Sequence, residues 1–462
     1  MWTPNIDHLE GPRYLAVASA IAQAIDSGEL APGAQLPPQR DLAERLGVTV
    51  GTITRAYSLI RKQNLVSGEV GRGTFVRRDD ADGGPRFEFR PDEQESRIID
   101  LSCYRAPVSG LSDVVAAAVG DLVERVALLP LHKYPPPAGF PAQRAAAASW
   151  ISRTGFAAEP ENLLLCAGAQ QAILIALTSL LFPGETILTD DITFPGFKAL
   201  AGMRGLTVRR VEMDQHGMTV DGLRAAVAET RARVVYLQST LHNPTTAIMP
   251  LERRKEIAAL ARAEDLLIIE DDVTAAVLTE RPPPIAAFAP EHVCYITGFA
   301  KCFSPALRIA FMVSPRAKVE SLAGTLHMMT LGTSPLMGEL ASVLLASGAA
   351  DDVVRRMNQE TARREAIARE VLARRNIRSH PASVHMWMSL PAPWRALDFE
   401  VAARRNGVAV VASDHFAAEE GKSAPAVRVS LNVGADDQVL KKGLAILDHL
   451  MDSRPYAAAT II

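Results

Sequence analysis

The chain has few cysteines, no long apolar run and no marked excess of charge of one sign. The four cysteines are scattered, with no Cys-x-x-Cys pair and no histidine at zinc-ligand spacing: Cys103, Cys166, Cys294 and Cys302. This pattern excludes a disulfide framework and indicates reduced thiols and no bound metal. Charge, glycine or proline interrupts each apolar stretch well before membrane-spanning length, and the first residues lack the features of an export signal. We therefore expect a cytoplasmic protein with no membrane partner.

The overall charge is low as well. The formal net charge is −3 and 22% of the residues are charged, so the whole chain exerts no general attraction on nucleic acid. One segment differs, because eight lysines and arginines stand against three acidic residues between Leu36 and Arg78. Such a local surplus suits the neutralisation of phosphates. A chain of 462 residues, 48% of them hydrophobic, is long enough for two or three folding units.

The basic segment falls within a pattern of three helices and a hairpin. Apolar residues at helical spacing predict helices over 13–27 and 39–46 and a third helix that Thr49 caps. Two short β segments follow within 65–76. Two helices joined by a glycine-containing turn are typical of a helix-turn-helix, and the hairpin suits a wing beside it. The residues expected to contact double-stranded DNA are Arg40, Arg45, Thr49, Gly51, Thr52, Arg55, Arg72 and Gly73.

A charged stretch rich in aspartate, glycine and proline separates this head from the rest of the chain. Because its composition cannot bury a core, it indicates a linker. We place a winged helix-turn-helix domain at 8–77, the linker at 78–98 and a larger domain at 99–462. Short apolar strands alternate with helices in the larger domain, which predicts an α/β fold with a mostly parallel sheet, and a smaller α+β subdomain is expected from about residue 350. The expected strands of the sheet are 163–167, 185–189, 207–211, 234–237, 266–270, 292–296 and 309–313.

Polar residues follow several of these strands at positions where a cofactor can bind. Lys301 follows one strand, Arg308 stands seven residues later, and Asp271 ends another strand, where a buried carboxylate needs a cationic partner. Ala169 and Gln170 lie at a strand-to-helix turn, whose N–H groups can hold an anion.

Phe194 adds an aromatic face to this set. Pyridoxal 5′-phosphate (PLP) requires these groups together: a lysine for a Schiff base, a carboxylate for the pyridine nitrogen, an aromatic ring and a phosphate cup. Each residue alone is weak evidence, whereas their joint order along the chain predicts a PLP site.

The segment from about Tyr14 to Val76 resembles the winged helix-turn-helix of the GntR family, and the chain from about Asp100 onward resembles a fold-type I aminotransferase. The whole chain therefore resembles the MocR-type regulators. One departure lies in the head, where Val50 stands after the capping threonine in place of a basic residue common in the family.

The resemblance implies a role for each site residue. Lys301 would carry the cofactor, Asp271 would partner its pyridine nitrogen, and Asn243 would bind its 3-hydroxyl. Arg308 would bind the phosphate with Ala169 and Gln170. Tyr134 would reach the phosphate in the neighbouring subunit, and Thr297 would partly replace a serine that binds the phosphate in the family. Arg428 would bind the carboxylate of a ligand. A tyrosine that reaches into the neighbouring site implies a homodimer, which we expect to be head-to-tail.

The function that this resemblance implies is a PLP-dependent regulator of transcription. It would bind promoter DNA and sense an amino acid or related primary amine through external aldimine formation at Lys301, and it would control genes for the uptake or catabolism of that compound. A catalytically active aminotransferase with an appended DNA-binding head is the alternative, although Val273 and Gly298 replace residues that support turnover in the family. A third possibility is a DNA-binding protein whose larger domain serves dimerisation alone.

Overall fold

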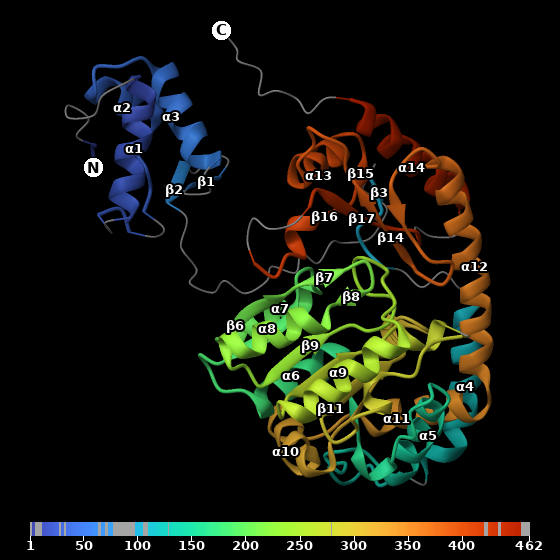
Figure 1. The fold of residues 1–462 in the computed structure, drawn as a ribbon. Coiled ribbons are helices and arrows are strands. Elements are labelled where there is room, and N and C mark those ends of the chain that lie inside the picture. Colours follow the sequence, from blue (N-terminus) through green and yellow to red (C-terminus); the bar gives the residue numbers. More distant parts are fainter. Residues whose placement is uncertain are drawn as a thin grey trace. The chain divides into compact units, whose positions relative to one another are not determined.

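Two parts of the chain, Met1–Gly84 and Pro85–Ile462, fold separately (Figure 1). The computed structural model describes residues 2–4, 12–26, 29–31, 34–62, 66–69, 73–76, 98–104, 110–127, 129–278, 280–419, 424–432 and 436–453. The segment predicted to be a linker, 78–98, lies outside these residues except for Ile98. No helix of the described part is both long and apolar enough to cross a membrane.

The N-terminal part is a winged helix-turn-helix. Its helices are α1 (Arg13–Asp26), α2 (Gln39–Arg45) and α3 (Val50–Lys62), and strands β1 (Val66–Glu69) and β2 (Gly73–Val76) pair antiparallel as the wing. The predicted order of helices and hairpin is confirmed.

Two contacts explain the turn between α2 and α3. The Thr49 hydroxyl accepts a hydrogen bond from the backbone N–H of Thr52 at 3.2 Å and so caps α3. Tyr57 of α3 is buried and donates its hydroxyl to the Pro37 carbonyl at 2.7 Å, which ties the recognition helix to the segment before α2. Gly47, in the turn itself, has φ +60°, a conformation that glycine adopts without strain.

The larger part is built on a seven-stranded sheet in the order β4-β12-β11-β10-β9-β5-β6. Strand β12 runs antiparallel to both of its neighbours, and the other pairs are parallel. The predicted mostly parallel sheet is therefore confirmed. The strands are β4 (Leu163–Cys166), β5 (Thr186–Asp190), β6 (Thr207–Val211), β9 (Val234–Leu237), β10 (Leu267–Asp271), β11 (Val293–Gly298) and β12 (Ala310–Val313).

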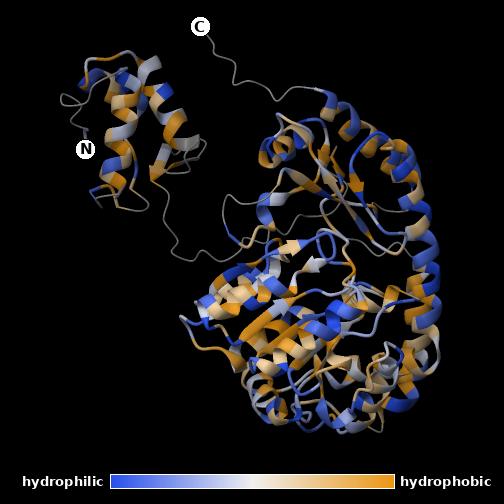
Figure 2. Cartoon of the chain, viewed as in Figure 1, coloured by the Kyte–Doolittle hydropathy of each residue, from blue (hydrophilic) through white to orange (hydrophobic). Residues whose placement is uncertain are grey.

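Helices cover both faces of this sheet. Alternate residues along each strand belong to two separate apolar clusters, and each cluster also contains helix residues. One cluster includes residues of α6, α7 and α10, and the other includes residues of α4, α5, α8, α9 and α11. Figure 2 shows the strands between them as strongly hydrophobic. The helices are α4 (Leu111–Val126), α5 (Pro141–Ser152), α6 (Ala169–Leu180), α7 (Pro195–Met203), α8 (Val220–Thr230), α9 (Leu251–Ala263), α10 (Val319–Thr330) and α11 (Pro335–Ala346).

A C-terminal subdomain follows, as the mixture of helix and strand patterns after residue 350 predicts. Its four-stranded sheet has the order β13-β14-β17-β16, and a separate parallel pair joins β3 to β15. The elements are α12 (Ala349–Val371), α13 (Ala396–Arg405), α14 (Asp437–Asp452), β3 (Ile99–Asp100), β13 (Ile377–Arg378), β14 (His385–Ser389), β15 (Val408–Ala409), β16 (Val411–Ala412) and β17 (Ala426–Ser430). Short 3-10 turns are η1 (Pro160–Asn162), η2 (Ala275–Val277), η3 (Ile285–Ala287), η4 (Pro305–Leu307), η5 (Arg316–Lys318) and η6 (Ser413–His415).

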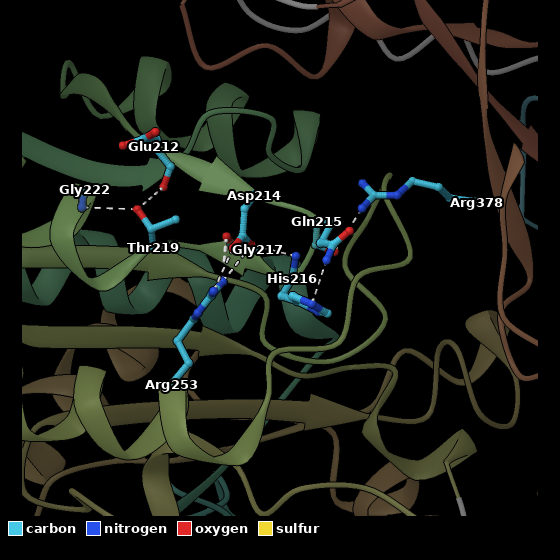
Figure 3. A network of polar contacts seen from close by, with 9 residues as sticks. All are labelled: Glu212, Asp214, Gln215, His216, Gly217, Thr219, Gly222, Arg253 and Arg378. Carbon is cyan, nitrogen blue, oxygen red and sulfur yellow. Dashed lines mark hydrogen bonds and ion pairs between the residues drawn. The ribbon is translucent and has the colours of Figure 1, made fainter. Parts of the chain in front are cut away.

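The subdomain contacts the large sheet domain at a small hairpin, β7 (Met213–Asp214) and β8 (Gly217–Met218). Arg253 of α9 holds the hairpin by two 2.7 Å hydrogen bonds to the Asp214 carboxylate (Figure 3). Arg378 of β13 donates to the Gln215 carbonyl in the turn at 3.2 Å (Figure 3). The turn is therefore anchored from the large domain and contacted from the C-terminal subdomain.

Candidate functional site

The predicted DNA-contacting residues of the head lie at the start of α3 and on α2. Five of these positions are exposed and lie outside the buried core: Arg40 and Arg45 on α2, Thr49 before α3, and Gly51 and Arg55 on α3. Thr52 is half-buried beneath them, with its hydroxyl 2.9 Å from that of Thr49. Gly73 begins β2, and Arg72 lies outside the described residues.

In the larger part, Lys301 stands in the turn that follows β11. Its Nζ lies 4.2 Å from the centre of the Tyr104 ring, and the Tyr104 hydroxyl donates to the Lys301 carbonyl at 3.2 Å. Burial, together with the positive charge of Arg428, lowers the pKa of Lys301 to about 8, although Asp271 acts in the opposite direction. About a tenth of such an amine is uncharged at pH 7, far more than for an ordinary lysine, and the uncharged amine is the nucleophile.

Asp271 ends β10 as a buried carboxylate. Its Oδ2 accepts hydrogen bonds from the Tyr236 hydroxyl at 2.6 Å and from Gln238 Nε2 at 3.2 Å. Its Oδ1 is buried and has no hydrogen-bond partner among the described residues. Burial raises the pKa of Asp271 to about 6, which the Tyr236 hydrogen bond opposes. A carboxylate oxygen in this state suits a cationic ring nitrogen.

The turn before α6 and the guanidinium group of Arg308 form a positively polarised cup. Gly168 adopts φ +95° and ψ +161°, and α6 begins at Ala169. The N–H of Gln171 donates to the Gly168 carbonyl, whereas the N–H groups of Ala169 and Gln170 stand at the open start of the helix. The guanidinium group of Arg308 lies so close to Gly168 that a β-carbon at this position would stand 2.3 Å from Arg308 Nη2. Only glycine lets the arginine come this near to the helix start. Arg308 therefore lies against the turn that precedes the predicted residue Ala169, and its Nη2 also donates to the Ala167 carbonyl at 3.5 Å.

Phe194 and Gln170 come together beside the cup. A β-carbon on Gly196 would lie 2.4 Å from Phe194 Cζ and 2.9 Å from Gln170 Nε2, so both side chains pack against the Gly196 backbone. Phe194 precedes α7 and is half-buried. The buried Thr297 lies on β11, directly before its last residue, and precedes Lys301 by four residues.

The neighbouring strand explains why position 298 is occupied by glycine. A β-carbon there would stand 2.7 Å from the Ala310 Cα of the neighbouring strand β12 and 2.7 Å from the carbonyl oxygen of Ile309, which precedes that strand. A serine does not fit this backbone, so the departure from the aminotransferase pattern is built into the pairing of β11 with β12.

Arg428 of β17 connects the two subdomains of the larger part. Its Nη1 donates to Asn243 Oδ1 at 3.0 Å, and its Nη2 donates to the Ser102 carbonyl at 2.7 Å. The guanidinium carbon lies 5.1 Å from the centre of the Phe416 ring. Its Nε is buried without a hydrogen-bond partner, and no carboxylate of the described residues pairs with it. Burial lowers the pKa of Arg428 to about 10.

Tyr134 lies between α4 and α5 and is 76% exposed. Among the described residues, it forms no hydrogen bond or ring contact with another predicted site residue. Sequence reasoning missed three further participants: Tyr236, Tyr104 and Phe416. A signal existed for Tyr236, since a tyrosine inside a buried apolar strand needs a partner for its hydroxyl.

Comparison with known proteins agrees with both halves of this description. Residues 13–76 match the gntR family of bacterial regulatory proteins, and residues 97–447 match aminotransferase class I and II. The HTH-type transcriptional regulator YdeF of Bacillus subtilis is 31% identical over 98% of this chain and 97% of its own length. The vitamin B6 salvage pathway transcriptional repressor PtsJ of Salmonella typhimurium is 26% identical over 93% and 97% of the two chains.

Among solved structures, the α-aminoadipate aminotransferase LysN from Thermus thermophilus superimposes with a TM-score of 0.69 at 24% identity, covering 77% of this chain and 92% of LysN. This likeness shows the fold of the larger part. Fold and site together define a regulator with a DNA-binding head and an aminotransferase-like domain. The chain belongs to the MocR-type regulators of the GntR family.

The cofactor of the aminotransferase-like domain is PLP, and the residues present fit it. Asp271 offers a buried, unpartnered oxygen to the ring nitrogen, and Lys301 has a lowered pKa. Arg308 and the first turn of α6 form the anion cup at Gly168.

Proposed function

We propose that this regulator senses an amino acid or a related primary amine at its PLP site and controls genes for the uptake or catabolism of that compound. When bound, PLP supplies an aldehyde carbon with which primary amines combine reversibly. Lys301 is suited to exchange because its pKa of about 8 leaves part of the amine uncharged near neutral pH. The DNA-binding head supports promoter DNA as the macromolecular partner, and a regulator that binds promoter DNA would act in the cytoplasm.

The observation that carries this proposal is the environment of Arg428. A largely buried guanidinium group is costly without a counter-anion, and no carboxylate of the described residues pairs with it. Its planar group suits the carboxylate of a ligand, and its positive charge lowers the pKa of Lys301. A ligand with an amine and a carboxylate would satisfy both residues at once. The proposed roles of the other site residues are those that the resemblance implies: Asn243 on the 3-hydroxyl, Phe194 against the ring, and Arg308 with the start of α6 on the phosphate.

Regulation further requires the ligand to favour one arrangement of the protein over another. Arg428 is suited to this role because its contacts come from both subdomains, through Asn243 on one side and Phe416 on the other. A ligand carboxylate that binds the guanidinium group would weaken some of these contacts relative to others.

We also propose a head-to-tail homodimer in which Tyr134 reaches the phosphate of the neighbouring subunit. Support comes from the exposure of the Tyr134 side chain, which is 76% exposed and therefore accessible to a neighbouring subunit. Other large apolar side chains of the larger part are exposed too, among them Val123 of α4 at 69% and Met328 of α10 at 79%. Sedimentation should give a dimer. A mixture of Tyr134→Ala and Arg308→Ala chains should bind PLP better than either variant alone, because half of the sites in a mixed dimer would be intact.

The sensing proposal is tested with the full-length protein loaded with PLP. Borohydride reduction should attach a pyridoxyl group to position 301 in the wild type and not in Lys301→Ala. Titration with a panel of amines should change both the absorbance of the bound cofactor and the affinity for promoter DNA, and amines that carry a carboxylate should lose their effect in Arg428→Gln. Rapid multiple turnover with an amino donor and a keto acid, with no change in DNA binding, would contradict the proposal and favour an enzyme.

A further inference from the structure

One oxygen of Asp271 is held by two side chains of the neighbouring strand and the loop after it. The Tyr236 hydroxyl donates to Oδ2 at 2.6 Å, and Gln238 Nε2 donates to the same atom at 3.2 Å. The other oxygen, Oδ1, has no partner among the described residues. The two donors therefore fix the rotation of the carboxylate and decide which oxygen is left for the ring nitrogen of PLP.

The acids on either side of Asp271 are stabilised differently. Glu270 accepts two backbone N–H groups as well as a serine hydroxyl. Arg254 favours the charged form of both Glu270 and Asp272. For Asp271, the largest influence that favours the charged form is the Tyr236 hydrogen bond. A tyrosine thus does for Asp271 part of what an arginine does for the neighbouring acids.

The geometry of Tyr236 is rigid. The residue lies on β9 and opposes Ile269 of β10 in parallel register, and its side chain is fully buried. Its ring stacks on Phe197 with 3.9 Å between centroids and 2° between planes. Burial and the nearby charge of Asp271 raise the pKa of Tyr236 well above its ordinary value, so its hydroxyl remains a donor at all working pH values.

We propose that Tyr236 is a positioning residue that acts through Asp271: it keeps the carboxylate charged and turned so that Oδ1 meets the pyridine nitrogen of PLP. The inference goes beyond amine sensing, because it concerns how firmly the site holds its cofactor. It stands whether or not an effector changes DNA binding.

The test is a double-mutant cycle on PLP binding with the full chain, using Tyr236→Phe, Asp271→Asn and the double variant. The affinity of the cofactor-free protein for PLP is measured by fluorescence titration. Tyr236→Phe should weaken binding roughly ten-fold, as expected for loss of one hydrogen bond to a charged acceptor. In the Asp271→Asn background the same change should have no further effect, because a residue that acts only through Asp271 has nothing left to act on.

The pH dependence of PLP affinity gives a second readout. It would not change if Tyr236 only supported the fold. Asp271 has a pKa of about 6, so its charged form, and with it PLP affinity, declines as pH falls through this value. Loss of the Tyr236 donor raises the pKa of Asp271 further. The decline in affinity should therefore begin at a higher pH in Tyr236→Phe than in the wild type.

Tyr295→Phe is the matched control. Tyr295 is equally buried, lies on the strand on the other side of β10 and donates its hydroxyl at 3.1 Å to Asp272. Its removal should leave PLP affinity and the pH midpoint unchanged. The proposal is overturned if Tyr295→Phe weakens binding as much as Tyr236→Phe does. Additive effects in the cycle, or an unshifted pH midpoint in folded Tyr236→Phe, would overturn it as well.

Discussion

Gly168→Ala should weaken PLP binding out of proportion to its effect on folding. Gly168 has φ +95° and ψ +161°, a region that residues with a β-carbon avoid at a cost of about 1–3 kcal/mol. The added carbon would also stand 2.3 Å from Arg308 Nη2 and 2.9 Å from Cζ. Since the backbone at the start of a helix gives little, we expect the Arg308 side chain to be displaced from the anion cup.

The size of the binding effect follows from what Arg308 contributes. A hydrogen bond between charged groups contributes about 1.5–3 kcal/mol. Its loss should therefore reduce PLP affinity roughly 10- to 150-fold. The free energy of unfolding of the cofactor-free protein should fall by no more than the backbone strain, about 1–3 kcal/mol.

Gly184→Ala separates the two effects. Gly184 has a similar φ of +90°, but a β-carbon there would meet nothing within 4 Å. This variant should show a loss of stability from backbone strain and bind PLP as the wild type does. PLP titration and urea denaturation of both variants provide the measurement. Equal PLP affinities for Gly168→Ala and Gly184→Ala would refute the account of the cup.

Three further outcomes are expected. Arg428→Gln should raise the pH at which the rate of PLP uptake reaches half its maximum, because the charge of Arg428 lowers the pKa of Lys301; stopped-flow absorbance measures this. Burial raises the pKa of Asp190 to about 7, so its ionisation destabilises the folded state as pH rises from about 4 to 7. Asp190→Asn should therefore gain more than about 1 kcal/mol of stability over the wild type at pH 8 and nothing below pH 4, by urea denaturation at each pH. Arg55→Ala should weaken DNA binding and reduce the slope of log affinity against log salt by about 1, by fluorescence anisotropy.

The fold could be predicted well because its signals are local. Apolar runs bounded by glycine and polar residues mark buried strands of a parallel sheet, and the predicted range 234–237 coincides with the buried strand β9. The antiparallel direction of β12 could not be read in this way. Strand direction depends on the path of the connection, and the short segment between β11 and β12, which carries Lys301, shows no periodicity.

The site was predictable where chemistry demands one residue type. A lysine after a strand and an acid at a strand end are visible in the sequence, and the structure shows the orphaned oxygen and the lowered pKa that suit PLP. Residues that act by packing were not predictable. Tyr104 lies 197 positions from Lys301, whose carbonyl accepts its hydrogen bond. Only the folded chain brings such residues together.

The contacts of Arg428 explain how the proposed ligand would act on both subdomains of the larger part. Its guanidinium group already spans the two subdomains: it donates to Asn243 after β9, donates to the Ser102 carbonyl after β3, and lies over Phe416 beside η6. The Phe416 carbonyl in turn accepts the backbone N–H of Thr193, next to Phe194 in the cofactor site. The proposed ligand, by engaging Arg428, would therefore act on both subdomains through contacts that exist before it binds. Because a ligand shifts an equilibrium only by its difference in affinity between states, a residue shared by both subdomains is where such a difference can arise.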